Sequence, residues 1–186
     1  MRSLILVLVF LVSVPSFAAD RVLQASASRI TFNFQQMNVP MDGSFKKISG
    51  KIDFDAAKPE AAKIEILVNT GSISVYEEAD PEVVKPIWLN VAAFPQARFV
   101  SKSIKALGNG RYQATGTLSI KGMSRDIVVP FEYKEQGVNA NVDGQFTLKR
   151  GDYKIGEGEW SAFDIVANDV LVKFHLVVGA AVAAKR

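Results

Sequence analysis

Apolar and polar residues alternate along most of this chain with a period of two. In residues 116–133, Leu118 and Ile120 alternate with polar residues before a short turn, and Val129 and Phe131 continue the alternation after it. Such alternation gives an extended strand one apolar and one polar face, and a short turn between two such runs makes a hairpin. The apolar face could meet a packed core, a membrane or a hydrophobic ligand, and each alternative implies a different function.

The same alternation recurs often enough to predict about eight strands. Clear runs cover residues 29–34, 51–55, 63–69, 111–120, 138–148 and 170–176, and a weaker run covers residues 97–104. Glycine-containing turns of the kind that joins hairpins lie at residues 108–110, 121–122 and 136–137. Two similar tetrapeptides, Asp-Gly-Ser-Phe at 42–45 and Asp-Gly-Gln-Phe at 143–146, are interpreted as a recurring turn before a strand. The pattern therefore favours an all-β antiparallel barrel or sandwich, with Val138 facing inward.

Two segments break the alternation. Residues 78–95 contain Asp80 as a candidate N-cap and Pro81 as a first helical residue, and a second proline in the segment prevents a long helix. We therefore expect a short helical segment near residues 80–93. Residues 150–169 contain three glycines without a clear period. A connection of this length in a compact domain is typical of a lid or rim loop.

The N-terminus carries a targeting signal. Residues 1–18 combine an early positive charge, an apolar run over residues 3–14 and small residues before Ala18, which are the three parts of a secretory signal peptide. The apolar run is shorter than the roughly 20 residues that a membrane-spanning helix needs. We therefore expect cleavage after Ala18, a single mature domain over residues 19–186 and a location in the periplasm.

Composition argues against several classes of site. The chain has no cysteine, one histidine and a formal net charge of +3 that is spread along its length. These features argue against disulfide frameworks, cysteine- or histidine-based metal sites and nucleic-acid binding. His175 lies on the polar face of its strand, and Lys121 with Ser124 is interpreted as part of a polar turn rather than a catalytic pair.

Acidic residues between 150 and 169 are the remaining candidates for catalysis, namely Asp152, Glu157, Glu159 and Asp164. Paired carboxylates act chemically when burial separates their pKa values, and nothing in the pattern indicates burial here. We interpret this segment, with its basic neighbours between 149 and 154, as a solvated loop. We predict no catalytic residue and no metal site, and a hydrolase that uses this loop is kept only as a third alternative.

Many phenylalanines lie on the apolar faces of the predicted strands. Six of them fall at inward positions: Phe32, Phe34, Phe54, Phe131, Phe146 and Phe174. An eight-stranded barrel has just enough interior to be filled by its own side chains or to hold one slender ligand, and periodicity does not separate these cases. An outer-membrane barrel would carry aromatic girdles at both interfaces, whereas these phenylalanines lie in the middle of strands.

Four stretches of the chain resemble, in order, motifs of the YceI-like family of exported lipocalin-like proteins. They are SRITFNFQQMNVPMDGSFKKISGKIDFD, FPQARFVSKSI, YQATGTLSIKGMSRDIVVPFEY, and FTLKRGDYKIGEGEW with NDVLVKFHL. The resemblance covers nearly all of the mature chain. It departs at EEADPEVVKPIWL, where many members have an Arg-Asp-x-His-Leu pattern. The preference for a ligand headgroup is therefore the family property that transfers least readily.

The resemblance implies an eight-stranded antiparallel lipocalin-like barrel with a long apolar pocket. It implies a periplasmic carrier of a long-chain isoprenoid lipid, such as an isoprenoid quinone or its precursor, with no other cofactor, no nucleic acid and no stable membrane insertion. Alternatives left open are a ligand-free stress or interaction module and a carrier of a fatty acid or fatty amide, and a homodimer is also left open. The pocket wall is expected to comprise Phe32, Phe34, Phe54, Ile64, Val68, Leu118, Ile120, Ile127, Val129, Phe131, Val142, Phe146, Val172 and Phe174.

Overall fold

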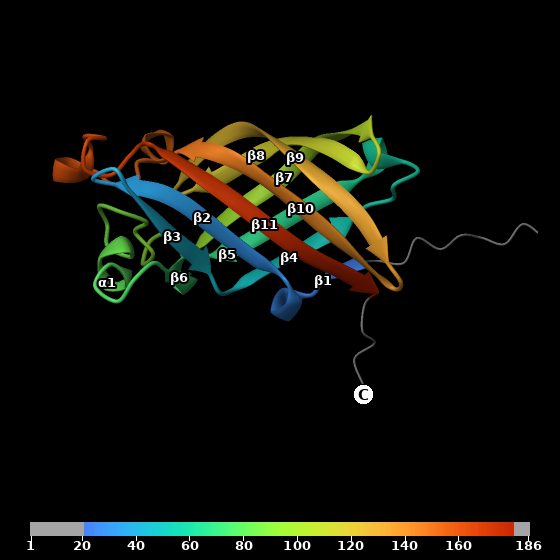
Figure 1. Ribbon diagram of the computed structural model, residues 1–186, viewed down its shortest axis with the longest axis horizontal. Coiled ribbons are helices and arrows are strands. Elements are labelled where there is room, and N and C mark those ends of the chain that lie inside the picture. The colour runs from blue at the N-terminus through green and yellow to red at the C-terminus, as the bar shows by residue number, and fades with distance from the viewer. Residues whose placement is uncertain (1–20, 181–186) are drawn as a thin grey trace, which may run out of the picture.

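Strand pairing closes the sheet of this protein on itself (Figure 1). The computed structural model describes residues 21–180, so the predicted signal peptide lies outside the described residues. Within them the strands are β1 (Arg21–Leu23), β2 (Arg29–Gln36), β3 (Val39–Phe45), β4 (Ile48–Asp53), β5 (Lys63–Asn69), β6 (Ile73–Ser74), β7 (Gln96–Gly108), β8 (Arg111–Ile120), β9 (Met123–Gln136), β10 (Asn139–Lys149) and β11 (Asp169–Ala180). The helical elements are α1 (Asp80–Val83) and the 3₁₀ turns η1 (Ala25–Ala27), η2 (Pro59–Ala61), η3 (Thr70–Ser72), η4 (Arg150–Tyr153) and η5 (Gly158–Trp160).

The described strands form eight barrel strands, because three long strands are each interrupted once. β1 and β2 lie end to end along β11, with Val22 opposite Gly179 and Phe32 opposite Val172. β3 and β4 follow one another along this first strand, and β5 and β6 form the next. Each barrel strand pairs with its neighbours in sequence, and the first closes on the last. This topology confirms the predicted eight-stranded antiparallel barrel.

The up-and-down order sorts the connections to two ends of the barrel. At one end, called the mouth, lie the β2–β3 hairpin tip and residues 75–95, 121–122 and 150–168. At the other, called the closed end, lie the turns at 109–110 and 137–138 and the paired ends of β1 and β11. Figure 1 shows α1 at the mouth, on the left, and β1 at the closed end, on the right.

The hairpin turns follow the predicted chemistry, but one strand begins later than expected. Asn109, Lys121 and Gly137 have positive φ, as the tight turns between twisted strands require. Val138 was expected to face inward, but it lies in the turn before β10 and is 81% exposed. The β9–β10 ladder begins only at Asn139, which is opposite Gln136, so the inward alternation starts at Ala140.

Helix occupies a small part of the predicted 80–93 segment. α1 covers only Asp80–Val83, and its N-cap is Ala79 rather than the expected Asp80. The Asp80 carboxylate instead accepts a hydrogen bond from the backbone N–H of Val75 at 2.6 Å. This contact stabilises the turn that leads out of β6, because it satisfies a backbone donor that has left the ladder.

The wall of the barrel has a seam between β9 and β10. These two strands pair only between 131–136 and 139–144, and the rest of β10 pairs only with β11. η4 folds back against β9, and its Tyr153 packs in one cluster with side chains of β8, β9 and β10. Tyr153 is 2% exposed, and its hydroxyl has no hydrogen-bond partner among the described residues. Burial raises the pKa of this phenol, and the neutral ring fills the space at the seam.

Replacement of Tyr153 by Phe should leave stability unchanged or raise it by about 1 kcal/mol, since the change removes a buried and unpaired hydroxyl. Tyr153→Ala should instead cost about 3 kcal/mol or more, since it empties the seam. Urea unfolding of both variants measures the difference. A clear loss of stability in Tyr153→Phe would show that the hydroxyl has a partner.

Candidate functional site

The closed half of the barrel is packed with aromatic side chains. Phe54 lies 5.0 Å from Tyr112 and 4.6 Å from Tyr133, measured between ring centroids. Tyr112 stacks on Phe131 at 5.4 Å, and all four rings are buried. Offset and edge-to-face contacts of this kind add to the stabilisation that burial provides. This half is therefore a solid core.

The half that faces the mouth is hollow. It encloses a cavity of about 400 Å³, within the range of small-molecule sites, and the cavity wall is predominantly apolar. On β10 the wall runs from Val142 to Leu148, or roughly 20 Å of strand at about 3.3 Å per residue. The lining ends at the exposed side chains of Tyr76, Glu78 and Glu82, so the cavity reaches the surface at the mouth.

Thirteen of the fourteen residues expected in the pocket wall line this cavity: Phe32, Phe34, Phe54, Ile64, Val68, Leu118, Ile120, Val129, Phe131, Val142, Phe146, Val172 and Phe174. The exception is Ile127, which is partly buried against the cluster that contains Tyr153 at the seam. Its strand has no β10 neighbour at that level, so the inward position does not face the cavity. That the thirteen contact a ligand stays a prediction.

Further apolar wall residues lie at positions that alternation marks as inward. Ile30, Ile52, Ile66, Leu148 and Leu176 belong to the predicted runs and line the cavity. Phe99, in the weaker run that became β7, lines it as well. By contrast, the mouth residues Tyr76, Trp88, Arg150 and Trp160 also line it but come from segments without a period. Alternation carries no information about such residues.

Three phenylalanine rings of the wall lie over glycines of neighbouring strands. Phe32 is opposite Gly43, Phe174 is opposite Gly144, and Phe99 covers Gly116. A Cβ atom at any of these glycines would overlap the ring. Each ring therefore lies against the wall, and the centre of the barrel stays open.

These contacts correct the interpretation of the two similar tetrapeptides. Asp-Gly-Ser-Phe lies within β3, and Asp-Gly-Gln-Phe lies within β10, so neither is a turn. Their glycines are needed because each leaves room for an aromatic ring of the paired strand. The shared sequence reflects this packing and no repeated turn.

Gly43→Ala should push the Phe32 ring into the cavity, reduce the cavity volume and destabilise the barrel by about 1–3 kcal/mol. Gly137→Ala has open space around the added Cβ atom. It should lower the stability by less, because its only penalty is the positive φ at this position. Urea unfolding, together with binding of a fluorescent apolar probe, checks both effects. Unchanged probe binding in Gly43→Ala would contradict the role given to this glycine.

Both tryptophans of the chain lie at the mouth. Trp88 comes from residues 75–95 and Trp160 from η5, and their ring centroids are 5.5 Å apart. The same two segments are joined through their backbones, because the N–H groups of Gly156 and Glu157 donate to the carbonyl oxygen of Ile87 at 2.9 and 2.8 Å. The mouth is thus built from two loops that support each other.

A buried arginine holds the 150–168 loop together. The Arg150 guanidinium donates hydrogen bonds to six backbone carbonyl oxygens, at distances of 2.7 to 3.2 Å, on residues 155, 156, 160, 162, 166 and 167. Its planar group lies 5.0 Å from the Phe163 ring and 5.8 Å from the Trp88 ring. Burial lowers the pKa of this guanidinium, yet an arginine stays charged at neutral pH.

The four acidic residues Asp152, Glu157, Glu159 and Asp164 are exposed, as a solvated loop predicts, whereas Arg150 is the exception at only 2% exposed. The carbonyl dipoles that surround it replace the water that the guanidinium loses on burial. Neither the alternation of apolar and polar residues nor the residue preferences of turns identifies such a buried arginine in a sequence. Its burial can be recognised only from the three-dimensional structure, in which the loop surrounds the guanidinium.

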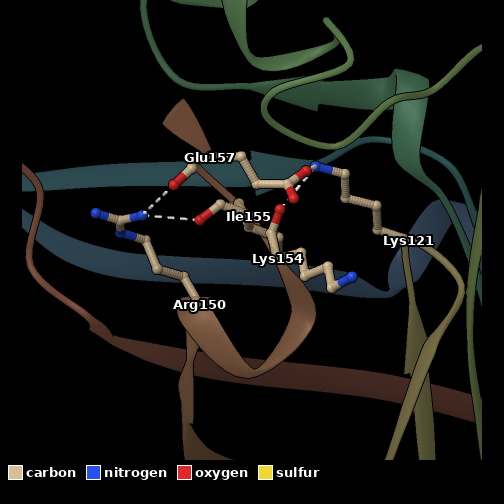
Figure 2. A network of polar contacts seen from close by, with 6 residues as sticks. Lys121, Arg150, Lys154, Ile155 and Glu157 are labelled. Carbon is tan, nitrogen blue, oxygen red and sulfur yellow. Dashed lines mark hydrogen bonds and ion pairs between the residues drawn. The ribbon is translucent and has the colours of Figure 1, made fainter. Parts of the chain in front are cut away.

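A second cation at the mouth, Lys121, connects the β8–β9 turn to the 150–168 loop (Figure 2). Its Nζ donates to the Lys154 carbonyl oxygen at 2.6 Å and pairs with Glu157 Oε2 at 2.7 Å. The Lys121 side chain is 5% exposed, so this turn is not the simple polar turn that was predicted. The hydrogen bond and the charge of Lys121 lower the pKa of the Glu157 carboxyl.

Arg150→Lys should destabilise the protein by roughly 3 kcal/mol, because a lysine keeps the charge but cannot reach six carbonyl oxygens with three donors. The exposed Arg125→Lys is the matched control and should change stability by less than about 0.5 kcal/mol. Urea unfolding measures both variants, and limited proteolysis should cut the 150–168 loop faster in Arg150→Lys. Equal resistance of that loop in the two variants would refute the proposed support.

The described residues were also compared with the requirements of a metal site, a catalytic histidine and a membrane-spanning helix. Among residues 21–180, no group of three or more His, Cys, Asp or Glu side chains is placed to hold a metal ion. His175 Nδ1 lies 2.6 Å from Asp143 Oδ1 on the outer face, away from the cavity. None of the helices in this part of the chain has the length and apolar character to cross a membrane.

Comparison with known proteins places these features in one family. The model of the YceI-like domain family matches residues 22–178. A UPF0312 protein of Ectopseudomonas mendocina (strain ymp) is 31% identical over 150 residues, which cover 75% of this chain and 78% of that protein. The crystal structure of BcnA from Burkholderia cenocepacia is similar, with a TM-score of 0.81, 34% identity, and coverage of 83% of this chain and 98% of that one.

A more distant structure shares the fold. It is a polyisoprenoid binding domain from Saccharophagus degradans, implicated in plant cell wall breakdown, with a TM-score of 0.70 and 16% identity. The likeness covers 87% of this chain and 99% of that domain.

Proposed function

Because the chain belongs to the family of YceI-like domains, we propose that it is a carrier that holds a long-chain isoprenoid lipid in its barrel and performs no chemistry on it. The observation that carries this proposal is the hollow half of the barrel, an apolar cavity of about 400 Å³ that reaches the surface at one end. An interior filled by its own side chains would have argued for a ligand-free module instead.

The shape and chemistry of the cavity fit a long apolar tail. Burial of apolar surface contributes roughly 25 cal/mol per Å², so affinity grows with the length of tail that the cavity covers. The phenylalanine rings that lie flat on the wall leave a continuous apolar channel along the strands. Phe54, Phe131 and Tyr133 of the aromatic core form the floor of the cavity and limit how deep a tail can reach.

The cavity also suggests how a ligand would be oriented. Its polar lining is concentrated at the mouth, where Gln36, Tyr76 and Glu78 line it, whereas the deep end is apolar. A headgroup buried at the deep end would lose its hydration without gaining partners, which is costly. The tail would therefore point to the closed end and the headgroup to the mouth.

Relatives and the leader sequence support the rest of the proposal. The domain from Saccharophagus degradans, described as polyisoprenoid binding, shares the fold. Residues 1–18 have the pattern of a secretory signal peptide, and this pattern supports the proposal of a periplasmic location. An isoprenoid quinone or its precursor is the proposed ligand, and a homodimer is compatible with the proposal.

Val129→Asp should remove most of the lipid that copurifies with the protein, because it places a carboxylate on the apolar wall. The neighbouring Val128 is exposed on the outer face of the same strand, so Val128→Asp is the matched control and should keep its lipid. Native mass spectrometry of protein purified from its own periplasm measures occupancy as an adduct of several hundred daltons.

The outcomes separate the alternatives. A bound isoprenoid in the parent protein and in Val128→Asp, but not in folded Val129→Asp, supports the proposal. A fatty acid or fatty amide in the extract would keep the carrier and replace its ligand. A clean mass without adduct in the parent protein, and no uptake of a polyprenol from detergent, would favour the ligand-free module.

A further inference from the structure

Exposed apolar side chains gather around the mouth of the barrel. Six large hydrophobic residues with exposures of 36% to 70% lie there, and they form what is called here the rim patch: Met37, Val39, Tyr76, Ile87, Phe163 and Ile165. At the closed end, the exposed residues of this kind are Val22, Leu107 and Val138. Exposed apolar residues that form a contiguous patch, in contrast to scattered ones, typically mark an interaction site.

The segments that carry the rim patch are joined to one another. The Met37 N–H donates to the Ile165 carbonyl oxygen at 2.7 Å, and the Tyr76 hydroxyl donates to Gln36 Oε1 at 3.3 Å. The Phe163 ring lies over Arg150, so the patch includes the loop that this arginine supports. The hairpin tip, the segment before α1 and the 150–168 loop therefore present one surface.

The rim patch is also continuous with the cavity. Tyr76 belongs to both, and the half-buried Trp88 and Trp160 line the cavity just inside the rim. An apolar molecule could pass between a surface covering the rim and the cavity without crossing water. Tryptophan and tyrosine rings are also the side chains that concentrate at the boundary between lipid headgroups and hydrocarbon.

Charge at the mouth restricts what can cover it. Residues 75–95, 121–122 and 150–168 contain eight acidic and four basic residues, a formal balance of −4 in a chain of net charge +3. Two of the acidic residues are paired, Glu82 with Lys85 and Glu157 with Lys121, whereas Glu77, Glu78, Glu159 and Asp164 are exposed around the patch. A second copy that docked mouth to mouth would bring these carboxylates together, which is unfavourable.

A strongly anionic membrane is disfavoured for the same reason. The headgroups of a zwitterionic bilayer fit better, since they present ammonium groups to the carboxylates and to the aromatic rings, with hydrocarbon beneath. From the patch, its continuity with the cavity and this charge, we propose that the mouth docks reversibly on a zwitterionic lipid surface and exchanges its ligand there. The inference rests on the proposed function, because it treats the bilayer as the source or acceptor of the lipid.

The test compares two double variants of the full protein. Met37→Ser with Ile165→Ser removes two exposed side chains of the rim patch, and Leu107→Ser with Val138→Ser removes two from the closed end as the matched control. Binding is measured by cosedimentation with vesicles of phosphatidylcholine and phosphatidylethanolamine. The two tryptophans at the mouth give a second readout, a blue shift of fluorescence on docking. Circular dichroism and a melting curve check that both variants fold.

Docking at the rim predicts that the rim variant binds these vesicles on the order of tenfold more weakly than the parent protein, since two apolar side chains lose their burial. The closed-end variant should bind like the parent, and vesicles enriched in phosphatidylglycerol should bind less well. The proposal is overturned if the parent does not bind zwitterionic vesicles, if both variants lose binding equally, or if anionic vesicles bind more tightly. A doubled mass in solution that only the rim variant abolishes would assign the patch to a second copy and also overturn it.

Loading from solution separates this inference from the function on which it rests. The polyprenol solanesol is offered in detergent, without vesicles, and uptake is followed by native mass spectrometry. Normal uptake by the parent and the rim variant, with no vesicle binding, would reject docking and leave the carrier function standing. Vesicle binding without uptake of solanesol or of lipid from the vesicles would reject the carrier function and with it the proposed exchange.

Discussion

The internal space of an eight-stranded barrel is so small that a cavity depends on where the large side chains lie. In this protein the Phe32, Phe99 and Phe174 rings lie against glycines of neighbouring strands, so they cover the wall without crossing the centre. At the closed end, Phe54 and its aromatic neighbours meet across the interior and fill it. The same residue type therefore fills the interior in one half and covers the wall in the other, where glycines of neighbouring strands leave room for the three rings.

The mouth depends on a different interaction. Its loops have no regular ladder, so their backbone carbonyl groups need other donors. Arg150 supplies them from the inside, and Lys121 with Glu157 attaches the loop to the β8–β9 turn. These contacts explain how a segment rich in glycine and charge can hold a defined opening at the end of an apolar cavity. The charged residues that remain outside determine which surfaces the opening can approach.

Alternation predicts the strands and most of the cavity wall because both follow from which face of a strand is apolar. It fails for Val138, which lies in the turn before the first paired residue of β10, and for Ile127, where the seam removes the neighbouring strand. Arg150 and the Phe–Gly contacts depend on which strands and loops meet in three dimensions, and no local pattern encodes that. The two segments without alternation could be assigned from the sequence to an end of the barrel, but the sequence did not show which of their side chains line the cavity.

The division of the barrel into a packed and a hollow half has a thermodynamic consequence. The closed half holds both ends of the described chain and the aromatic core, whereas the mouth half surrounds the cavity and has the smaller buried cluster around Tyr153. Regions with few buried contacts open at lower free energy than the rest of a protein. A lipid in the cavity would supply such contacts and so would serve as part of the hydrophobic core. The melting temperature of such a protein is then a property of its cargo as well as of its sequence.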